Sequence, residues 1–159
     1  MYKRQDKVSI NSAAVRTPEL ITQIARRYGS QCVVVAIDVK QESDNQWYVY
    51  TSGGRNKTNL EAISWAMEVT RLGAGEILLT SMNNDGTKAG FALEITSQIA
   101  KQVSIPVIAS GGAGKIEHFT ELFTSTTASA GLAASIFHFN EIPIPTLKQA
   151  LKKNKISVR

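Results

Sequence analysis

The sequence has 159 residues, of which 43% are hydrophobic and 19% charged, which is the composition of an ordinary globular domain. No apolar run approaches the roughly 20 residues of a membrane span, and the basic start lacks the apolar stretch of a secretory signal. The net charge of +5 comes mainly from residues near the two ends, without a nucleic-acid-binding motif, so we expect neither membrane nor nucleic-acid partners. The single cysteine, Cys32, leads us to expect a cytoplasmic protein.

Short β-rich runs alternate with helical segments along the whole chain. In the first half of the chain we expect a strand at 7–11, a helix at 18–28 capped by Thr17 and Gly29, strands at 32–38 and 47–54 joined through a polar hairpin turn, and a helix at 60–73. In the second half we expect a strand at 76–81, a helix at 91–103, a strand at 106–110, a helix at 116–125, a strand-like stretch at 130–137 and a helix at 146–154. The run at 32–38 is apolar almost throughout, which is typical of strands buried on both faces. Its Cys32 is the only cysteine, and we expect a buried structural thiol in a reducing compartment.

These segments form five β-then-α units, with no linker or low-complexity segment between them. Such alternation predicts the α/β class, with parallel strands and covering helices. Two architectures remain open at this point, an open doubly wound sheet and part of a (βα)8 barrel. Eight units of this size would need about 250 residues, the usual length of such a barrel, whereas this chain has five.

Polar and small residues gather where the expected strands end. In parallel α/β folds, ligands and catalytic groups lie at the carboxyl ends of the strands. These positions hold Asn11, Ser12, Asp38, Thr80, Asp85, Gly86, Thr87, Ser110, Gly111, Gly112, Ala134 and Ser135. A set that is short of bulky side chains suits an anionic ligand.

The stretch SGGAGK (110–115) has three glycines directly after an apolar strand. Glycine marks backbone that takes positive φ or closely approaches a neighbour, and the N–H groups of such a loop can bind phosphate. The spacing fits neither a Walker A motif nor G-x-G-x-x-G, so an ordinary strand-to-helix turn is the alternative. The small residues AAS at the next strand end favour a phosphate site, because barrels often bind phosphate with the loops of their last two strands.

Asp38 ends the apolar run VVVAID, where burial would raise its pKa toward the range useful for acid–base chemistry. A helix cap or a partner for Lys40 is the alternative interpretation. Asp85 could act in the site or serve as a turn residue, because Asp-Gly is a common turn dipeptide. His118 and His138 lack metal-ligand spacing, so we expect structural roles for both and no metal site.

Five stretches together resemble the cyclase subunit of imidazole glycerol phosphate synthase: KVSINSAAV, PELITQIARRYGSQCVVVAIDVK, GAGEILLTSMNNDGTKAGF, PVIASGGAGKIEHF and LAASIFHF. The resemblance begins at Lys7 and implies strand four to helix eight of a (βα)8 barrel. It implies a lyase of histidine biosynthesis that uses ammonia and a bisphosphate substrate, a phosphoribulosyl formimino aminoimidazole carboxamide ribotide. The implied products are imidazole glycerol phosphate and aminoimidazole carboxamide ribotide, and no cofactor is implied.

The same resemblance implies a role for each matching residue. Asp38 matches the second of two catalytic aspartates. The implied substrate-binding and phosphate-binding residues are Asp85, Gly86 and Thr87 in a substrate loop, Gly112, Ala134 and Ser135 at one phosphate site, and Asn11 and Ser12 at part of the other. Thr80, Ser110 and Gly111 are expected to bind substrate or phosphate as well, because they lie at the same strand ends. Lys7 and Glu76 match charged residues at the far end of the barrel, where ammonia enters from a glutaminase partner.

The family's first catalytic aspartate, its lysine loop and one glycine-rich phosphate loop have no counterpart here, so we expect a truncated fragment that is inactive alone. Residues 1–6 match nothing in the family and are expected to be a non-native or disordered leader, while 7–159 form the carboxyl-terminal part of one barrel domain. Two alternatives stay open: the isomerase of the same pathway, which shares the half-barrel plan, and a non-catalytic phosphate-binding half-barrel.

Overall fold

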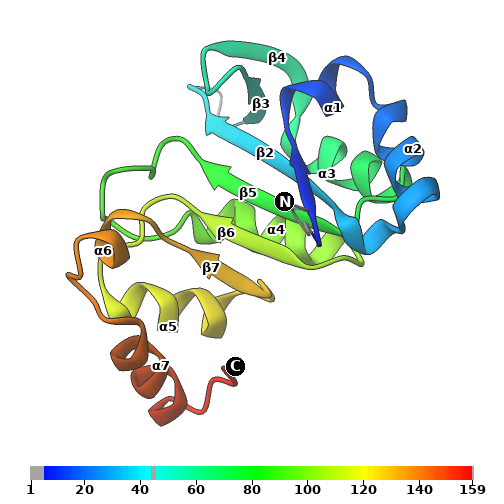
Figure 1. Cartoon of the computed structure of the whole chain (residues 1–159). Coiled ribbons are helices and arrows are strands. Elements are labelled where there is room, and N and C mark those ends of the chain that lie inside the picture. Colours follow the sequence, from blue (N-terminus) through cyan, green and yellow to red (C-terminus); the bar gives the residue numbers. More distant parts are fainter. Residues whose placement is uncertain (1–5, 44–45, 159) are drawn as a thin grey trace.

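The computed structural model describes residues 6–43 and 46–158, and it contains one mixed sheet (Figure 1). Five parallel strands follow one another in the order β1 (Val8–Ile10), β2 (Val33–Gln41), β5 (Glu76–Ser81), β6 (Val107–Ser110) and β7 (Ala130–Leu132). Two further strands, β3 (Trp47–Thr51) and β4 (Asn56–Glu61), form an antiparallel excursion. It pairs with the carboxyl half of β2, on the edge whose amino half pairs with β1.

The connections between the parallel strands are helical. The longer helices are α2 (Glu19–Tyr28), α3 (Ala62–Arg71), α4 (Leu93–Gln102), α5 (Ile116–Ser125) and α7 (Ile144–Lys153), and the short ones are α1 (Ser12–Arg16), the 3-10 turn η1 (Ser30–Cys32) and α6 (Ser135–His138). In Figure 1, α3 and α4 lie behind β2, β5 and β6. Among the described residues, no helix is long and apolar enough to cross a membrane.

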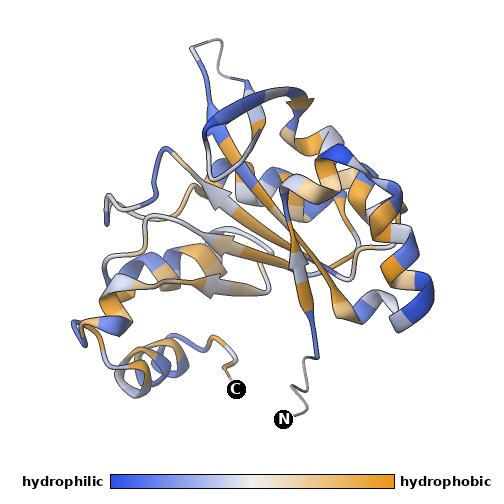
Figure 2. Cartoon of the chain, turned by 45° about the horizontal axis from the view of Figure 1, so that its top comes forward, coloured by the Kyte–Doolittle hydropathy of each residue, from blue (hydrophilic) through white to orange (hydrophobic). Residues whose placement is uncertain are grey.

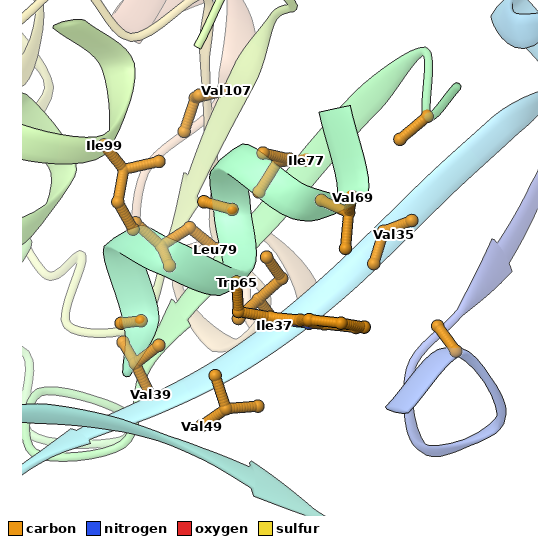
Figure 3. Close-up of a cluster of buried hydrophobic side chains, with 14 of the residues drawn as sticks. Val35, Ile37, Val39, Val49, Trp65, Val69, Ile77, Leu79, Ile99 and Val107 are labelled. Carbon is orange, nitrogen blue, oxygen red and sulfur yellow. The ribbon is translucent and has the colours of Figure 1, made fainter. Parts of the chain in front are cut away.

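One face of the sheet carries the main core. Val35, Ile37, Val39 and Ile77 are fully buried and Leu79 nearly so, and Figure 3 shows them packed around Trp65 and Val69 of α3. The alternating residues Ala36, Leu78, Ile108 and Ala130 point to the opposite face and remain partly exposed. Figure 2 shows the hydrophobic colour concentrated in the central strands and on the helix sides turned toward them.

Within residues 6–43 and 46–158, the helices pack on one face of the sheet, whereas a doubly wound sheet carries helices on both faces. The fold is therefore an open segment of a (βα)8 barrel, with its inner face uncovered and five parallel βα units, as the sequence predicts. The expected leader at 1–6 falls almost entirely on residues 1–5, which lie outside the described residues.

Most expected elements are confirmed, and the strand at 76–81 and the helix at 116–125 have the expected bounds. The strand-like stretch at 130–137 was wrong in its second half, where the chain turns into α6. The reason is that β6 ends at Ser110, the partner of Leu132, so β7 has no neighbour to pair with beyond that residue. The helix α1 and the strand β4 were not expected from the sequence.

Two local expectations for the first helical unit need correction. The Thr17 side chain does not cap α2, whose N-cap is Pro18, although Gly29 closes the helix with a φ of 91°. Cys32 is only partly buried, because it lies in η1 before β2 begins, and its Sγ donates to the carbonyl oxygen of Tyr28 at 3.1 Å.

Candidate functional site

Three of the expected site residues lie side by side because of strand register. Asp38 of β2 is paired with Thr80 of β5, and Thr80 is paired with Ser110 of β6. Register partners in parallel strands point to the same face, here the uncovered face of the sheet, and all three are partly exposed. The carboxyl ends of the central strands therefore present one carboxylate and two hydroxyl groups in a row.

Asn11 joins this row from the end of β1. Its Nδ2 donates to Oδ2 of Asp38 at 2.8 Å, so the amide fixes the carboxylate, while Asn11 Oδ1 is buried without a partner in the described structure. We call Asn11, Asp38 and Thr80 the Asp38 cluster. Partial burial raises the pKa of Asp38, the bond from Asn11 lowers it, and the nearby Asp85 carboxylate raises it, with a net increase. A carboxylate with a raised pKa can exchange protons closer to neutral pH than an ordinary aspartate can.

Ser12 lies beside this cluster but is engaged with the β3–β4 turn. Its Oγ accepts a hydrogen bond from the backbone N–H of Ser52 at 2.8 Å. The turn runs through Ser52, Gly53 and Gly54, which all have positive φ. The excursion therefore folds back over the end of β1, and the Ser12 hydroxyl helps to hold it there.

A second group of expected residues surrounds a cavity of about 240 Å³, which we call the loop cavity. It lies among the loops that follow β5, β6 and β7. Its lining includes the expected residues Asp85, Gly86, Ser110, Gly111, Gly112, Ala134 and Ser135. Asn11, Ser12, Asp38, Thr80 and Thr87 do not line it. Apart from Thr87, the expected site residues at the carboxyl end thus form two neighbouring groups, with Ser110 in the row of the first and in the lining of the second. The Thr87 hydroxyl belongs to neither group and donates to the Asn84 carbonyl at 2.6 Å.

The glycines at 111 and 112 are required by loop packing. Both have positive φ, at 92° and 96°. A Cβ on Gly112 would lie 2.0 Å from the carbonyl oxygen of Gly90, and a Cβ on Gly111 would lie 2.7 Å from that of Ser81. The N–H of Gly90 donates to the Gly112 carbonyl at 2.7 Å. The glycine loop therefore presses directly on the loop that carries Asp85, and no larger residue fits at either position.

Lys88 lines the loop cavity, although it was not among the site residues expected from the sequence. Its backbone has a φ of 57°, and its Nζ lies 2.7 Å from both carboxylate oxygens of Glu141, between α6 and α7. The signal was present in the sequence, because Lys88 directly follows the stretch NDGT that contains three expected site residues. Its partner could not be seen, since Glu141 is 53 positions away.

At the opposite end of the sheet, Lys7 and Glu76 form an ion pair. Lys7 directly precedes β1, and Glu76 begins β5, where it is in register with Val34. Glu76 also borders a larger cavity of about 1040 Å³ beside β7, α5 and α7. The structure brings the two expected residues together, while their part in ammonia entry stays a prediction.

The histidines make local contacts. The backbone N–H of Gly114 donates to Nδ1 of His118 at 3.1 Å, so this histidine supports the glycine loop. The His138 ring packs edge-on against Phe139, with centroids 5.0 Å apart. Across residues 6–43 and 46–158, no three His, Cys, Asp or Glu side chains are grouped to hold a metal ion.

Comparison with known proteins gives one consistent result. The model of the histidine biosynthesis protein family matches residues 2–143, so the match begins within the stretch 1–6 that was expected to lie outside the resemblance. A protein of Hydrogenobaculum sp. (strain Y04AAS1), named imidazole glycerol phosphate synthase subunit HisF, is 62% identical over 97% of this chain and 61% of its own length. Proteins of the same name from Alkaliphilus metalliredigens and Streptococcus mutans are 58% and 52% identical over the same shares. The chain therefore spans about three-fifths of the length of these curated relatives.

Proposed function

Because the chain belongs to the histidine biosynthesis protein family, we propose that it supplies the carboxyl-terminal part of a cyclase subunit of imidazole glycerol phosphate synthase. The observation that carries this proposal is the 62% identity to a subunit of that name, over almost the whole chain. The activity would be that of a lyase that combines ammonia with a phosphoribulosyl formimino aminoimidazole carboxamide ribotide. The same relatives favour this reaction over the related isomerisation and over a non-catalytic half-barrel.

Asp38 is the residue to which we assign proton transfer. Its raised pKa and its position on the uncovered face allow it to take up and return a proton during ring closure. Asn11 would keep the carboxylate oriented through its 2.8 Å bond, so that the second carboxylate oxygen faces the substrate. Thr80, beside Asp38 in register, would add a hydroxyl that can donate to or accept from the substrate.

The loop cavity is the site to which we assign one phosphate group of the substrate. Backbone N–H groups of a positive-φ glycine loop form a concave site for anions, and the Ser135 hydroxyl can donate to the same oxygens. Asn11 and Ser12 are proposed to form part of the second phosphate site, near the β3–β4 turn. A bisphosphate held at both places would extend along the strand ends, with its reacting centre close to Asp38.

The amino end of the sheet would receive ammonia. We assign this role to Lys7 and Glu76 because their ion pair lies at the opposite end of the strands from Asp38. A glutaminase subunit that docks at this end could release ammonia without exposing it to solvent. No cofactor is part of the proposal, since ring closure with ammonia needs proton transfer and positioning rather than redox chemistry.

A chimera tests the proposal. The matching 61% of the Hydrogenobaculum protein would be replaced by residues 6–159 of this chain, so that the rest of the relative completes the barrel. With substrate and ammonium salt, we expect turnover that yields imidazole glycerol phosphate and aminoimidazole carboxamide ribotide. A folded chimera that lacks this turnover, or that only isomerises a related ribotide, would overturn the assignment.

A further inference from the structure

Lys88 provides a positive charge at the loop cavity. Among the described residues that line this cavity, Lys88 is the only cation and Asp85 the only carboxylate. A phosphate group bound there would lie close to the Asp85 carboxylate. Two like charges in one partly enclosed site repel each other unless a cation accompanies them.

The backbone of Lys88 is held firmly in place. The loop that carries it is fixed by the bond from Gly90 N–H to the Gly112 carbonyl and by the Asn84 amide, which donates to the Gly90 carbonyl at 2.9 Å. A Cβ on Gly114 would lie 2.5 Å from both Cβ and the carbonyl oxygen of Lys88, so the two loops are in direct contact. Only the end of the Lys88 side chain is free to change its partner.

The present partner of Lys88 is a weak competitor. The ammonium lies 2.7 Å from Glu141, but the two side chains are 45% and 39% exposed, and exposed ion pairs contribute little net free energy. Glu141 is not among the residues that line the cavity. A phosphate dianion inside the cavity carries more charge than a carboxylate and accepts hydrogen bonds at several oxygens.

From this geometry we propose that Lys88 is a phosphate-binding residue whose ammonium is held by Glu141 when the cavity is empty and transfers to the phosphate when the cavity is filled. The inference rests on the phosphate site proposed above and adds to it the cation and the competing carboxylate. Because Lys88 and Asp85 share one loop, the transfer would also hold Asp85 at the rim of the cavity when substrate is bound.

Calorimetric titration of the 159-residue chain with inorganic phosphate tests this proposal. We expect Lys88→Met to weaken phosphate binding by about tenfold, because a charge-assisted hydrogen bond is lost. Glu141→Gln should instead strengthen binding, since it removes the competitor for the ammonium. Lys115→Met, which removes an exposed lysine outside the cavity, is the matched control and should leave binding unchanged. Lys88→Arg keeps the positive charge and should retain most of the affinity for phosphate. It serves as the second variant if Lys88→Met folds poorly.

Lys88→Met and Glu141→Gln together show whether Lys88 binds phosphate or only supports the loops through its ion pair. If the Lys88–Glu141 pair only supports the loops, both variants break the same bond and must change binding in the same direction, which would overturn the proposal. In the double variant, the gain from Glu141→Gln should disappear, because no ammonium is left to release. Gly112→Val reports on the site itself: if it leaves phosphate binding unchanged, the proposed phosphate site fails, and the Lys88 proposal falls with it.

Discussion

The Asp38 cluster and the loop cavity lie at the same end of the sheet but are built in different ways. In the cluster, the register of β2 and β5 aligns Asp38 with Thr80, and Asn11, which follows β1, is joined to them by its bond to Asp38. The cavity is formed mostly by backbone, with glycines at 111 and 112 that the opposite loop requires. Because the cavity depends on backbone contacts and the cluster on side chains, we expect substitutions to destabilise the fold more in the cavity than in the cluster.

The largest expected effect is on turnover, in the Asp38 cluster. In the active chimera, Asp38→Asn should lower kcat by about 10² to 10⁴, because the amide keeps the shape but cannot exchange the proton. KM should change by no more than a few-fold, since the phosphate contacts are untouched. Steady-state kinetics with ammonium salt measures both constants. Turnover like that of the unmodified chimera would mean that Asp38 has only a structural role.

The second prediction concerns the loop cavity, where a single methyl group should disturb folding. Gly112→Ala should lower the free energy of unfolding by about 3 kcal/mol, because the Cβ would lie 2.0 Å from a backbone oxygen at a φ of 96°. Urea denaturation of the 159-residue chain measures this change. Phosphate binding should be lost with it, since the two loops must separate to accept the methyl group.

Gly86→Ala is the matched control for that variant. Gly86 also has positive φ, at 75°, but a Cβ there would meet nothing within 4 Å. Only the left-handed backbone conformation is then unfavourable, so we expect a loss of about 1 kcal/mol. Equal losses at the two positions would show that backbone conformation, and not contact between the loops, explains the need for glycine.

Sequence patterns predict the framework of this fold better than its contacts. The strand at 76–81 and the helix at 116–125 were predicted with correct bounds, because their apolar periodicity matches their burial. β4 was missed because NKTNLE has almost no β-branched or aromatic residues, and it is held as a strand by its pairing with β3. Tertiary pairing of this kind leaves no local signal.

The candidate site shows the same limit. Residues at strand ends could be found from the sequence, since parallel strands bring their carboxyl ends together. The sequence did not show that these residues form two groups, or that Gly112 faces the Gly90 carbonyl. The partner of Lys88 was hidden as well, because Glu141 comes from a loop beyond two further strands.

The smallest expected effect returns to the Asp38 cluster, where the substitution that removes activity should slightly increase stability. The pKa of Asp38 is raised in the folded chain, chiefly by burial and also by Asp85, so the folded state holds this proton more tightly than the unfolded state does. The contribution of the Asp38 carboxyl group to the free energy of unfolding is therefore fully present below its pKa in the unfolded chain. This contribution is lost as the pH rises through its pKa in the folded chain. Near neutral pH, the ionised carboxylate is a net cost to folding. Asp38→Asn should remove that cost while its Oδ1 still accepts from Asn11.

We expect Asp38→Asn to raise the free energy of unfolding by less than about 1 kcal/mol at neutral pH, because solvent screens a half-buried charge. The gain should shrink as the pH falls, since the native aspartate then takes up its proton. Urea denaturation across this pH range measures the difference between the two chains. In an Asp85→Asn background the gain should be smaller, because one source of the raised pKa is gone. A loss of stability at neutral pH would show that Asn11 stabilises the charged carboxylate by more than burial destabilises it, and the Asp38 cluster would then contribute to stability, as we expect the loop cavity to do.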